Sequence, residues 1–563
     1  MDIVLMPPGP NGAQKGKEAM SDHAKPSRQS MARGQRDSKD RGFAAITVAV
    51  GLYVAAVGGG PALIFWLFAE NRDWGEFWRV AAGPTGTMLA AAGAVLAAYL
   101  ALHNGERSRR QDRDSTDRDR RAATERDLRT RFTSAAEQLG DERINVRQAG
   151  AYAMAGIADD WLTHAANEPM GSREAQVCID VLCAALRDTQ RALPLDKAGE
   201  PADQPVRTVI VHIAALHLRH DAEPSWRNLR FDLAGAYLHN VNFSQCHFDG
   251  SLTLADARFA GQQADFTGSH FSNTTFDRAE FQLGTTAEFT HTIWKTLALF
   301  KRTVFGGSLD FDHSQFYAGA NYSSASIGTA AGHASTASFQ KVGFSGTADF
   351  SYMDAYCSMT FYKATFIGPA DFRRLNSAKP EHDGSVSFQS ATFHGPAEFE
   401  YCQIGGLADF RKTIFLGTRT TPTTLDEAFF DGEEAVRFVE AKFFICEFGG
   451  VWFEREVSFY HTEFSTEAPF RRAVFAAPVR FEYATFKNGA TFREVEFRCG
   501  ADFYRVNFGD RTVDFTDPTI WNDIRVDWDG TSPFPTSRLT QPPNVLPADW
   551  PPQAISQSDS LTE

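Results

Sequence analysis

The residues that could carry chemistry in this chain are seven cysteines, 15 histidines and 70 Asp and Glu among 563 residues. None of them lies in a recognisable catalytic or cofactor-binding pattern. The sequence contains no GxxxxGK(S/T) phosphate loop, no HExxH zinc motif, no GxSxG elbow and no CxxC pair. The histidines are scattered without the spacing of metal ligands. The sequence therefore predicts a protein that is not an enzyme and has no catalytic residue, cofactor or metal.

The cysteines fit a packing role. Cys246, Cys402 and Cys446 each lie two residues before a large apolar residue, which favours burial in a core over metal ligation. Cys178 and Cys183 are five residues apart on one predicted helix and face different ways. An odd number of cysteines without close pairs does not match a disulfide framework, so we expect a reducing compartment.

Many acidic residues share one position in the repetitive part of the chain. Each of them directly precedes a phenylalanine, as do Asp265, Asp349, Asp371, Asp409 and Asp502. Neighbouring residues of an extended segment point to opposite faces, so a buried phenylalanine places these carboxylates outward. We interpret them as solvated surface residues rather than paired catalytic carboxylates.

The phenylalanines reveal the element that positions these residues. The chain has 48 of them, and 42 lie between residues 229 and 530. In the clearest stretch, a structural core ladder, their spacing alternates five and six residues: Phe448, Phe453, Phe459, Phe464, Phe470, Phe475, Phe481, Phe486, Phe492, Phe497, Phe503 and Phe508. A helical seam needs spacings of three and four, and a conventional strand a spacing of two. Neither ordinary element explains the ladder.

A second signal accompanies the ladder. Two residues before every one of these phenylalanines lies a small or β-branched residue. A small and a large inward side chain with one outward residue between them suit a short extended face, after which the chain turns a corner and repeats. Coils that stack at ~4.8 Å would pair their backbones and align the phenylalanines along the axis of a solenoid.

Three segments of this region carry a family resemblance: residues 231–248 (FDLAGAYLHNVNFSQCHF), 264–281 (ADFTGSHFSNTTFDRAEF) and 348–350 (ADF). They resemble pentapeptide repeats, whose consensus is A(D/N)(L/F)XX. The resemblance implies a right-handed quadrilateral β-helix with four five-residue faces per coil. The six-residue steps depart from that pattern and predict 22 residues per coil, with extra residues at two corners. The repeat domain is assigned to 226–530, and the roughly 285 residues that match the repeats give about 13 coils and a rod of ~60 Å at ~4.8 Å per coil.

The register weakens near residues 317–338, 373–387 and 416–437, where phenylalanine leaves its regular positions. We expect loops or degenerate coils there. Excursions from a solenoid often bind partners, although a tolerated insertion is the more common explanation. The sequence leaves open whether these insertions are functional.

The part before the repeats predicts a membrane anchor. Residues 1–42 are rich in Pro, Gly, Ser and charge and are expected to be a disordered tail. Within 43–102, two uncharged runs, 43–69 and 80–102, are each long enough to cross ~30 Å of hydrocarbon. We expect a two-helix transmembrane hairpin rather than buried core helices or a cleaved signal peptide. Basic outer flanks then predict an integral protein of the cell membrane with cytoplasmic N- and C-termini.

Residues 103–225 are expected to form a charged stalk helix and a small helical domain. The stalk has ten Arg and seven acidic residues between His103 and Arg131, which suits either attraction to anionic lipid or a solvated helix. Apolar residues at helical spacing predict three further helices, starting near Val146, Val177 and Val206. Residues 131–161, 177–186 and 206–219 resemble the helical region that precedes the repeats in membrane-anchored pentapeptide-repeat proteins from actinobacteria, a resemblance that implies no activity. Residues 531–563 are expected to be a disordered tail.

The predicted fold class is two transmembrane helices and a small all-α domain followed by a right-handed quadrilateral β-helix. The leading functional hypothesis is a non-enzymatic, membrane-tethered scaffold that presents the solenoid for protein–protein interaction. Its partners would be an unknown protein and membrane lipid through residues 43–102, with a homodimer left open. The net charge of −14, diluted over a long chain, disfavours nucleic acid.

The resemblance also implies an alternative to the scaffold function, a DNA mimic, because some pentapeptide-repeat proteins mimic DNA and bind a type II topoisomerase. Between residues 229 and 530 we count 38 Asp and Glu against 26 Lys and Arg, a net charge of −12. This charge is mild for a duplex mimic, and the expected anchor would hold the protein away from most chromosomal DNA. Continuous negative stripes on the solenoid would favour the mimic, and mixed charge would favour the scaffold.

Overall fold

The structure is a computed structural model that describes residues 74–164, 169–192, 195, 200–329, 335–377, 384–417, 422–430, 435–530 and 540–554, with isolated residues between 51 and 66. The chain divides into two compact units, Met1–Ala123 and Thr124–Glu563. The predicted tail 1–42 lies outside the described residues, as does nearly all of the first uncharged run, 43–69.

Helix α2 (Trp74–Gly140) contains the second uncharged run and the charged segment that follows it in one helix of 67 residues. Among the helices that the structure describes, none is long and apolar enough to cross a membrane. For the described residues, this finding contradicts the predicted transmembrane pair and the predicted localisation as an integral membrane protein; the first predicted span, 43–69, lies almost entirely outside them. Of the 23 residues of 80–102, 12 are Ala or Gly, which have less apolar surface per residue than Leu, Ile or Phe.

The second unit begins with a small helical region. Its helices are the end of α2, α3 (Ile144–His164), α4 (Pro169–Arg187), the short α5 (Thr189–Ala192) and α6 (Gln204–His217). A proline in the first turn suits the start of α6, because the first amides of a helix have no intrahelical acceptor. The apolar stripes meet in one core, in which Leu139, Met154, Trp161, Ile179 and Ile210 are buried.

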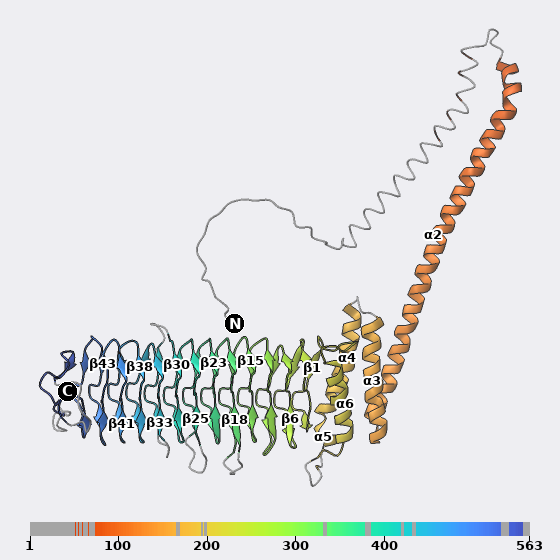
Figure 1. Cartoon of the computed structure of the whole chain (residues 1–563). Coiled ribbons are helices and arrows are strands. Elements are labelled where there is room, and N and C mark those ends of the chain that lie inside the picture. Colours follow the sequence, from red (N-terminus) through yellow and green to blue (C-terminus); the bar gives the residue numbers. More distant parts are fainter. Residues whose placement is uncertain are drawn as a thin grey trace, which may run out of the picture. The chain divides into compact units, whose positions relative to one another are not determined.

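From Arg230 to Leu546 the chain winds as a right-handed solenoid of short parallel strands (Figure 1). We number its four faces in chain order. Face 1 contains β1 (Arg230–Asp232), β4 (Ser251–Thr253), β8 (Thr274–Thr275), β12 (Ala298–Leu299), β16 (Ala320–Asn321), β20 (Ala348–Asp349), β24 (Ala370–Asp371), β27 (Ala397–Glu398), β31 (Thr423–Thr424), β35 (Cys446–Glu447), β39 (Ala468–Pro469), β43 (Ala490–Thr491), β46 (Val513–Asp514) and β49 (Val545–Leu546). Face 2 contains β2 (Tyr237–His239), β5 (Arg258–Ala260), β9 (Glu280–Phe281), β13 (Val304–Phe305), β17 (Ser326–Ile327), β21 (Asp354–Ala355), β28 (Gln403–Ile404), β32 (Phe429–Phe430), β36 (Trp452–Phe453), β40 (Val474–Phe475), β44 (Glu496–Phe497) and β47 (Ile520–Trp521).

The other two faces complete each coil. Face 3 contains β6 (Gln263–Asp265), β10 (Thr286–Glu288), β14 (Leu309–Asp310), β18 (Thr336–Ser338), β22 (Ser358–Thr360), β25 (Val386–Ser387), β29 (Ala408–Asp409), β33 (Val436–Arg437), β37 (Val457–Ser458), β41 (Val479–Arg480), β45 (Ala501–Asp502) and β48 (Ile524–Arg525). Face 4 contains β3 (His247–Phe248), β7 (His270–Phe271), β11 (Ile293–Trp294), β15 (Gln315–Phe316), β19 (Gly343–Phe344), β23 (Thr365–Phe366), β26 (Thr392–Phe393), β30 (Ile414–Phe415), β34 (Lys442–Phe443), β38 (Glu463–Phe464) and β42 (Thr485–Phe486).

Aromatic rings fill the interior in columns that run from coil to coil. On face 3, the rings of Phe459, Phe481 and Phe503 stack nearly parallel, with centroids 4.8 and 4.9 Å apart. Phe470 and Phe492 of face 1 meet the Phe481 ring edge-on at 5.7 Å. Each ring thus makes stacked contacts along its column and edge contacts across the interior, both favourable geometries for aromatic pairs.

The five-residue steps contain a turn with a left-handed residue. After the inward Phe300, for example, Arg302 has φ 57°, and the Thr303 amide donates to the Phe300 carbonyl at 3.1 Å. The six-residue steps add one residue at each of the other two corners. A coil therefore takes 22 residues, as in the pairing of Val457 with Val479.

The insertions interrupt the corners and leave the ladder intact. Paired residues of face 3 are 28 apart at Leu309 and Ala337 and 27 apart at Met359 and Val386, but the strands on either side stay in register. Three of the stretches outside the described residues fall between faces 2 and 3: 330–334, 378–383 and 431–434. A fourth, 418–421, falls between faces 4 and 1. These four stretches therefore all lie at the six-residue corners.

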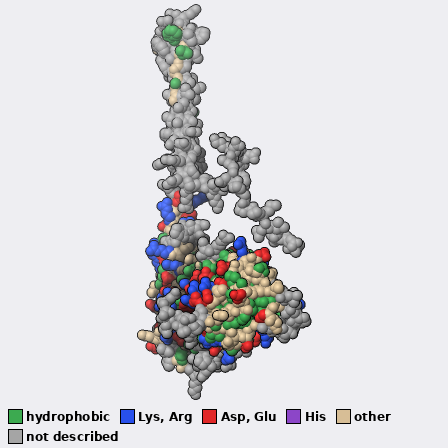
Figure 2. Space-filling model, turned by 90° about the vertical axis from the view of Figure 1, so that its left-hand side faces the viewer, with side chains coloured by type: hydrophobic (Ala, Val, Ile, Leu, Met, Phe, Trp, Pro, Cys, Tyr) green, Lys and Arg blue, Asp and Glu red, His purple; other side chains and the backbone are tan. Residues whose placement is uncertain are grey.

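Both ends of the ladder are covered. At the first coil, the buried Trp226 donates its indole N–H to Asp159 of α3 at 2.8 Å and stacks on His217 of α6 at 4.1 Å. At the last coil, β49 pairs with β46, and the ring of Trp550 lies 5.5 Å from Trp521 and 5.3 Å from Trp528. Figure 2 shows this end, where hydrophobic side chains gather beside a cluster of charged ones. Residues 540–554, inside the segment predicted to be a disordered tail, thus belong to the described solenoid.

A buried ionic cluster connects the helical region to the first coil. Asp203, just before α6, bonds Arg147 of α3 at 2.9 Å and Arg207 of α6 at 2.6 Å. The side chains of all three residues are no more than 6% exposed. Arg207 also donates to the carbonyls of Leu186, at the end of α4, and Tyr237, in β2, at 2.6 and 3.0 Å. One guanidinium therefore ties two helices and the solenoid together.

Candidate interaction surfaces

The ladder phenylalanines lie inside the solenoid, at most 2% exposed, and fall three to a face. By face they are Phe448, Phe470 and Phe492 (face 1), Phe453, Phe475 and Phe497 (face 2), Phe459, Phe481 and Phe503 (face 3), and Phe464, Phe486 and Phe508 (face 4). Because side chains occupy this interior, functional contacts must involve the outer surface or the ends.

Face 1 carries a row of carboxylates. Asp349, Asp371 and Glu398 lie side by side on successive strands. The guanidinium of Arg373 approaches the carboxylates of Asp371 and Glu398 at 2.6 and 3.0 Å. Partial burial, offset in part by the positive charge of Arg373, raises the pKa of Glu398 above its usual value. Negative charge is thus concentrated here and only partly neutralised.

Further along face 1, partial burial raises the pKa of Asp426 to about 6, and the nearby carboxylates of Glu447, Glu400 and Glu427 add to this effect. The backbone amide of Gly449 donates to the Asp426 carboxylate at 2.8 Å and opposes the shift. Like charges are therefore crowded on this part of the solenoid.

An exposed aromatic stack borders the same coils, at the corner between faces 1 and 2. The Arg374 guanidinium lies 5.6 Å from the ring centre of Tyr352 and 5.1 Å from that of Tyr401. The two tyrosines are 59% and 47% exposed. We call Tyr352, Arg374 and Tyr401 the corner stack. Cation–π contacts hold its large side chains in place on the surface.

The acidic residues singled out in the sequence do not converge on a catalytic pair. Asp349 and Asp371 lie on face 1, whereas Asp265, Asp409 and Asp502 lie on face 3. Asp409 is only 3% exposed, because Arg411 folds over it and binds its carboxylate at 2.6 Å. The expectation of a solvated position is wrong for Asp409, since an arginine two residues away covers it.

In the later coils many other acids have an arginine partner. Such ion pairs join Arg480 to Glu482, Arg498 to Glu496, Arg471 and Arg472 to Glu494, and Arg493 to Asp517. Opposite charges alternate on this surface and cancel much of its field at a distance. The later coils therefore carry mixed charge rather than a continuous negative stripe.

Six of the seven cysteines, Cys178, Cys183, Cys246, Cys357, Cys402 and Cys446, are buried thiols, and Cys499 is exposed. Burial raises the pKa of Cys246 and Cys402 to about 12. Across the described residues, no group of three or more His, Cys, Asp or Glu is arranged to hold a metal ion. The buried thiols are packing residues of low reactivity, because only a thiolate is a strong nucleophile.

This difference predicts a labelling pattern. A water-soluble thiol reagent at neutral pH should modify one cysteine of the native chain, Cys499, and all seven in denaturant. Mass spectrometry would identify the labelled peptide, and the Cys499→Ser variant should label at background level. Rapid native labelling of Cys402 or Cys446 would contradict the burial described here.

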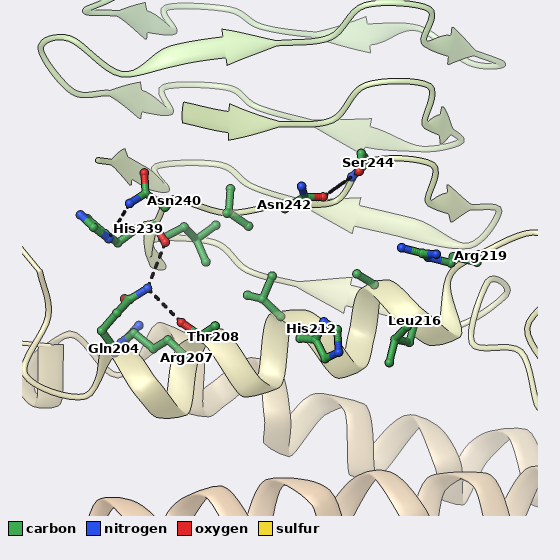
Figure 3. A pocket seen from close by; sticks show the side chains of 14 residues that line it. Gln204, Arg207, Thr208, His212, Leu216, Arg219, His239, Asn240, Asn242 and Ser244 are labelled. Atoms are coloured by element: carbon green, nitrogen blue, oxygen red, sulfur yellow. Dashed lines mark hydrogen bonds between the residues drawn. The ribbon is translucent and has the colours of Figure 1, made fainter. Parts of the chain in front are cut away.

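A groove lies between α6 and the first coil of the solenoid (Figure 3). It encloses about 320 Å³. Its walls are α6 residues and Arg219 on one side and residues 238–242 with Ser244 on the other, and no Asp or Glu is among the lining residues. Gln204 lies at one end, where it donates to Thr208 and to the His239 carbonyl at 3.2 and 3.1 Å, and Arg219 lies at the other end.

Comparison with known families matches this architecture. Pentapeptide repeats, in nine copies, match residues 233–281, 383–424 and 459–507. The solenoid contains pentapeptide repeats. The matched segments fall in early, middle and late coils of the solenoid, and the strands between them continue the same four faces. No curated protein and no solved structure matches this chain.

Sequence reasoning missed the surface features of this protein for identifiable reasons. The corner stack joins residues 22 and 27 positions apart, and it becomes visible only once the coil length and the insertion after Asn376 are both known. The spacing of Asp349–Tyr352, Asp371–Arg374 and Glu398–Tyr401, three residues in each case, is the signal that could have revealed it. The groove combines a helix with a coil, and no short motif marks it.

Proposed function

We propose that this protein is a non-enzymatic scaffold whose solenoid binds a protein partner. The observation that carries the proposal is the corner stack, because two exposed tyrosines and an arginine held in fixed positions are typical of interface hot spots. The solenoid fold itself is common among interaction scaffolds, and its rigid surface leaves little ordering entropy to lose on binding.

The partner that fits this surface carries positive charge. Asp349, Asp371 and Glu398 of face 1 each lie three residues before a member of the corner stack, so the acidic row and the stack form one continuous surface. Lysine or arginine side chains of a partner could pair with the carboxylates while an apolar part contacts the tyrosine rings. Electrostatic complementarity of this kind mainly raises association rate and specificity.

Photo-crosslinking tests the proposal. A benzophenone amino acid at Tyr352 or Tyr401 should capture the same protein partner reproducibly in cells, and the same group at Thr485 on face 4 serves as a matched control. Glu398→Lys should reduce capture by roughly tenfold or more, since reversing the charge of a carboxylate that faces a cationic partner costs at least ~1.4 kcal/mol. The midpoint of thermal unfolding should stay unchanged.

Two results would contradict the scaffold. Equal capture at Tyr352 and Thr485 would show that the corner stack is no interface. Inhibition of gyrase supercoiling by the purified chain, relieved by Asp371→Lys and Glu398→Lys, would instead support the DNA mimic. The ion-paired carboxylates of the later coils do not favour the mimic.

A further inference from the structure

We propose that the groove between α6 and the first coil binds a short, extended, acidic peptide segment of a partner protein, which pairs with the backbone of Asn242, the position of the first coil that α6 leaves uncovered. This inference rests on the proposed scaffold function and gives it a second contact site. The groove lies at the first coil, whereas the corner stack lies on coils that begin more than 100 residues later. The two sites can therefore be tested separately.

The first coil has no earlier coil to pair with, so its backbone needs other partners on that side. On face 3, the Val241 carbonyl accepts from the Asp265 amide at 2.9 Å, and the Phe243 amide donates to the Asp265 carbonyl at 2.7 Å. Alternate residues of an extended strand direct their backbone groups to opposite sides. The N–H and C=O of Asn242 therefore point away from the second coil, into the groove, and within the described chain they form no hydrogen bond.

Side chains of α6 replace the missing coil at neighbouring positions but not at Asn242. Arg207 donates to the Tyr237 carbonyl at 3.0 Å, and Gln204 donates to the His239 carbonyl at 3.1 Å. The Oε1 atom of Gln204 is itself buried without a hydrogen-bond partner in the described structure. Burying an unpaired polar group of this kind costs free energy. Within the part of the chain that the structure describes, the groove therefore offers a ligand an unpaired backbone donor, the Asn242 N–H, and two unpaired acceptors, the Asn242 carbonyl and Gln204 Oε1.

These groups define the chemistry of the ligand. A donor and an acceptor on one strand residue are the pattern that an added strand pairs with, so the ligand is an extended main chain. Val211 and Leu216 of α6, with Leu238 of β2, provide apolar surface for one side chain. The volume of about 320 Å³ is at the small end for ligand sites and suits only a short segment.

The charge of the groove selects an acidic segment. Arg219 and His212 are exposed lining residues, and the Arg219 side chain makes no hydrogen bond or ion pair with another described residue. Because no carboxylate lines the groove, a Glu or Asp side chain of the ligand would find an uncompensated guanidinium at this end (Figure 3). A charge-assisted bond of this kind is among the stronger polar contacts in proteins.

Fluorescence anisotropy on the full-length chain tests the proposal. The probe is a pentapeptide with blocked ends, labelled with an uncharged BODIPY dye, with Val at its second position and Glu at its fourth, so the only carboxylate is that side chain. We expect saturable binding. Replacing the peptide Glu with Gln, or methylating the central peptide nitrogen, should each weaken it by roughly tenfold or more, because the first removes a charged bond and the second blocks strand pairing.

Protein variants locate the binding site. Arg219→Glu should abolish binding of the probe, and Ala215→Trp should do so by filling the groove, whereas Arg374→Glu in the corner stack should have no effect. Thermal unfolding reports whether each variant is folded, and Arg219→Glu, at an exposed position, keeps the test valid if the tryptophan variant does not fold.

Three outcomes would overturn the inference: no saturable binding below about 1 mM, binding unaffected by Arg219→Glu, or competition by free succinate as strong as by the unlabelled peptide. The last would indicate an anion site rather than an added strand. None of these outcomes would alter crosslinking at the corner stack, so failure here is distinguishable from failure of the proposed function.

Discussion

Replacing Phe443 with Ala is expected to lower the free energy of unfolding by about 3–5 kcal/mol. Its ring is fully buried and stacks on Phe415 and Phe464 of the same column, with centroids 4.8 and 5.4 Å away. Phe448 of face 1 meets it edge-on at 5.3 Å. The neighbours in the column are fixed by strand pairing, so they cannot collapse into the space, and the full cavity cost should appear.

The adjacent residue supplies a matched control. Phe444 follows Phe443 directly but points outward and is 45% exposed. Phe444→Ala removes the same atoms from the surface and should change stability by no more than about 1 kcal/mol. Urea unfolding of the purified chain, followed by near-ultraviolet circular dichroism, measures both changes. Similar losses for the two variants would contradict the alternation of inward and outward residues that defines the solenoid.

The phenylalanine ladder was predictable because contacts between neighbouring coils of a solenoid recur at a nearly fixed separation in the sequence. Each coil contacts mainly its neighbours, so the residue that packs on Phe481 lies one coil away and occupies the same place in the repeat. Spacing in the sequence therefore reports packing in space directly. The same logic gave 22 residues per coil from the alternation of five and six.

The regular phenylalanine spacing breaks down on face 2, where the order of the small and the large inward residue is reversed in two successive coils. At β21 the inward pair is Met353 and Ala355, and in the next coil it is Leu375 and Ser377, all buried. The large residue has moved to the position that is small elsewhere. These residues still fill the interior of the solenoid, but none of them is a phenylalanine. A search for regularly spaced phenylalanines therefore missed coils that are intact.

Other features involve residues that no repeat relates. The transmembrane prediction relied on missing charge, which is a weaker criterion than apolar area for a run so rich in Ala and Gly. The ionic cluster joins Arg147 to Asp203, 56 residues apart in the chain. Which arginine meets which carboxylate depends on how the helices pack, and helical periodicity alone does not specify it.

The ionic cluster predicts the second large effect. Asp203→Ala should lower the free energy of unfolding by about 3–5 kcal/mol, because it leaves the guanidinium groups of Arg147 and Arg207 buried without their carboxylate. Arg207 would still donate to the carbonyls of Leu186 and Tyr237, but the Arg147 guanidinium would lose the one hydrogen-bond partner it has among the described residues. Asp256→Ala breaks an exposed pair with Arg278 of similar length, 2.7 Å, and should cost far less, because water screens that pair.

A double-mutant cycle separates the ionic interaction from lost packing. In the wild-type chain, Arg147→Met should be destabilising, because Asp203 loses one of its two cationic partners. In the Asp203→Ala background, the same change should instead recover stability, because it removes an uncompensated buried charge and keeps an apolar side chain of similar length. We expect a coupling free energy of roughly 1–3 kcal/mol from urea unfolding of the four proteins. Additive effects within about 0.5 kcal/mol would mean that Arg147 and Asp203 act independently, and the cluster would then not be the link between the helices and the solenoid.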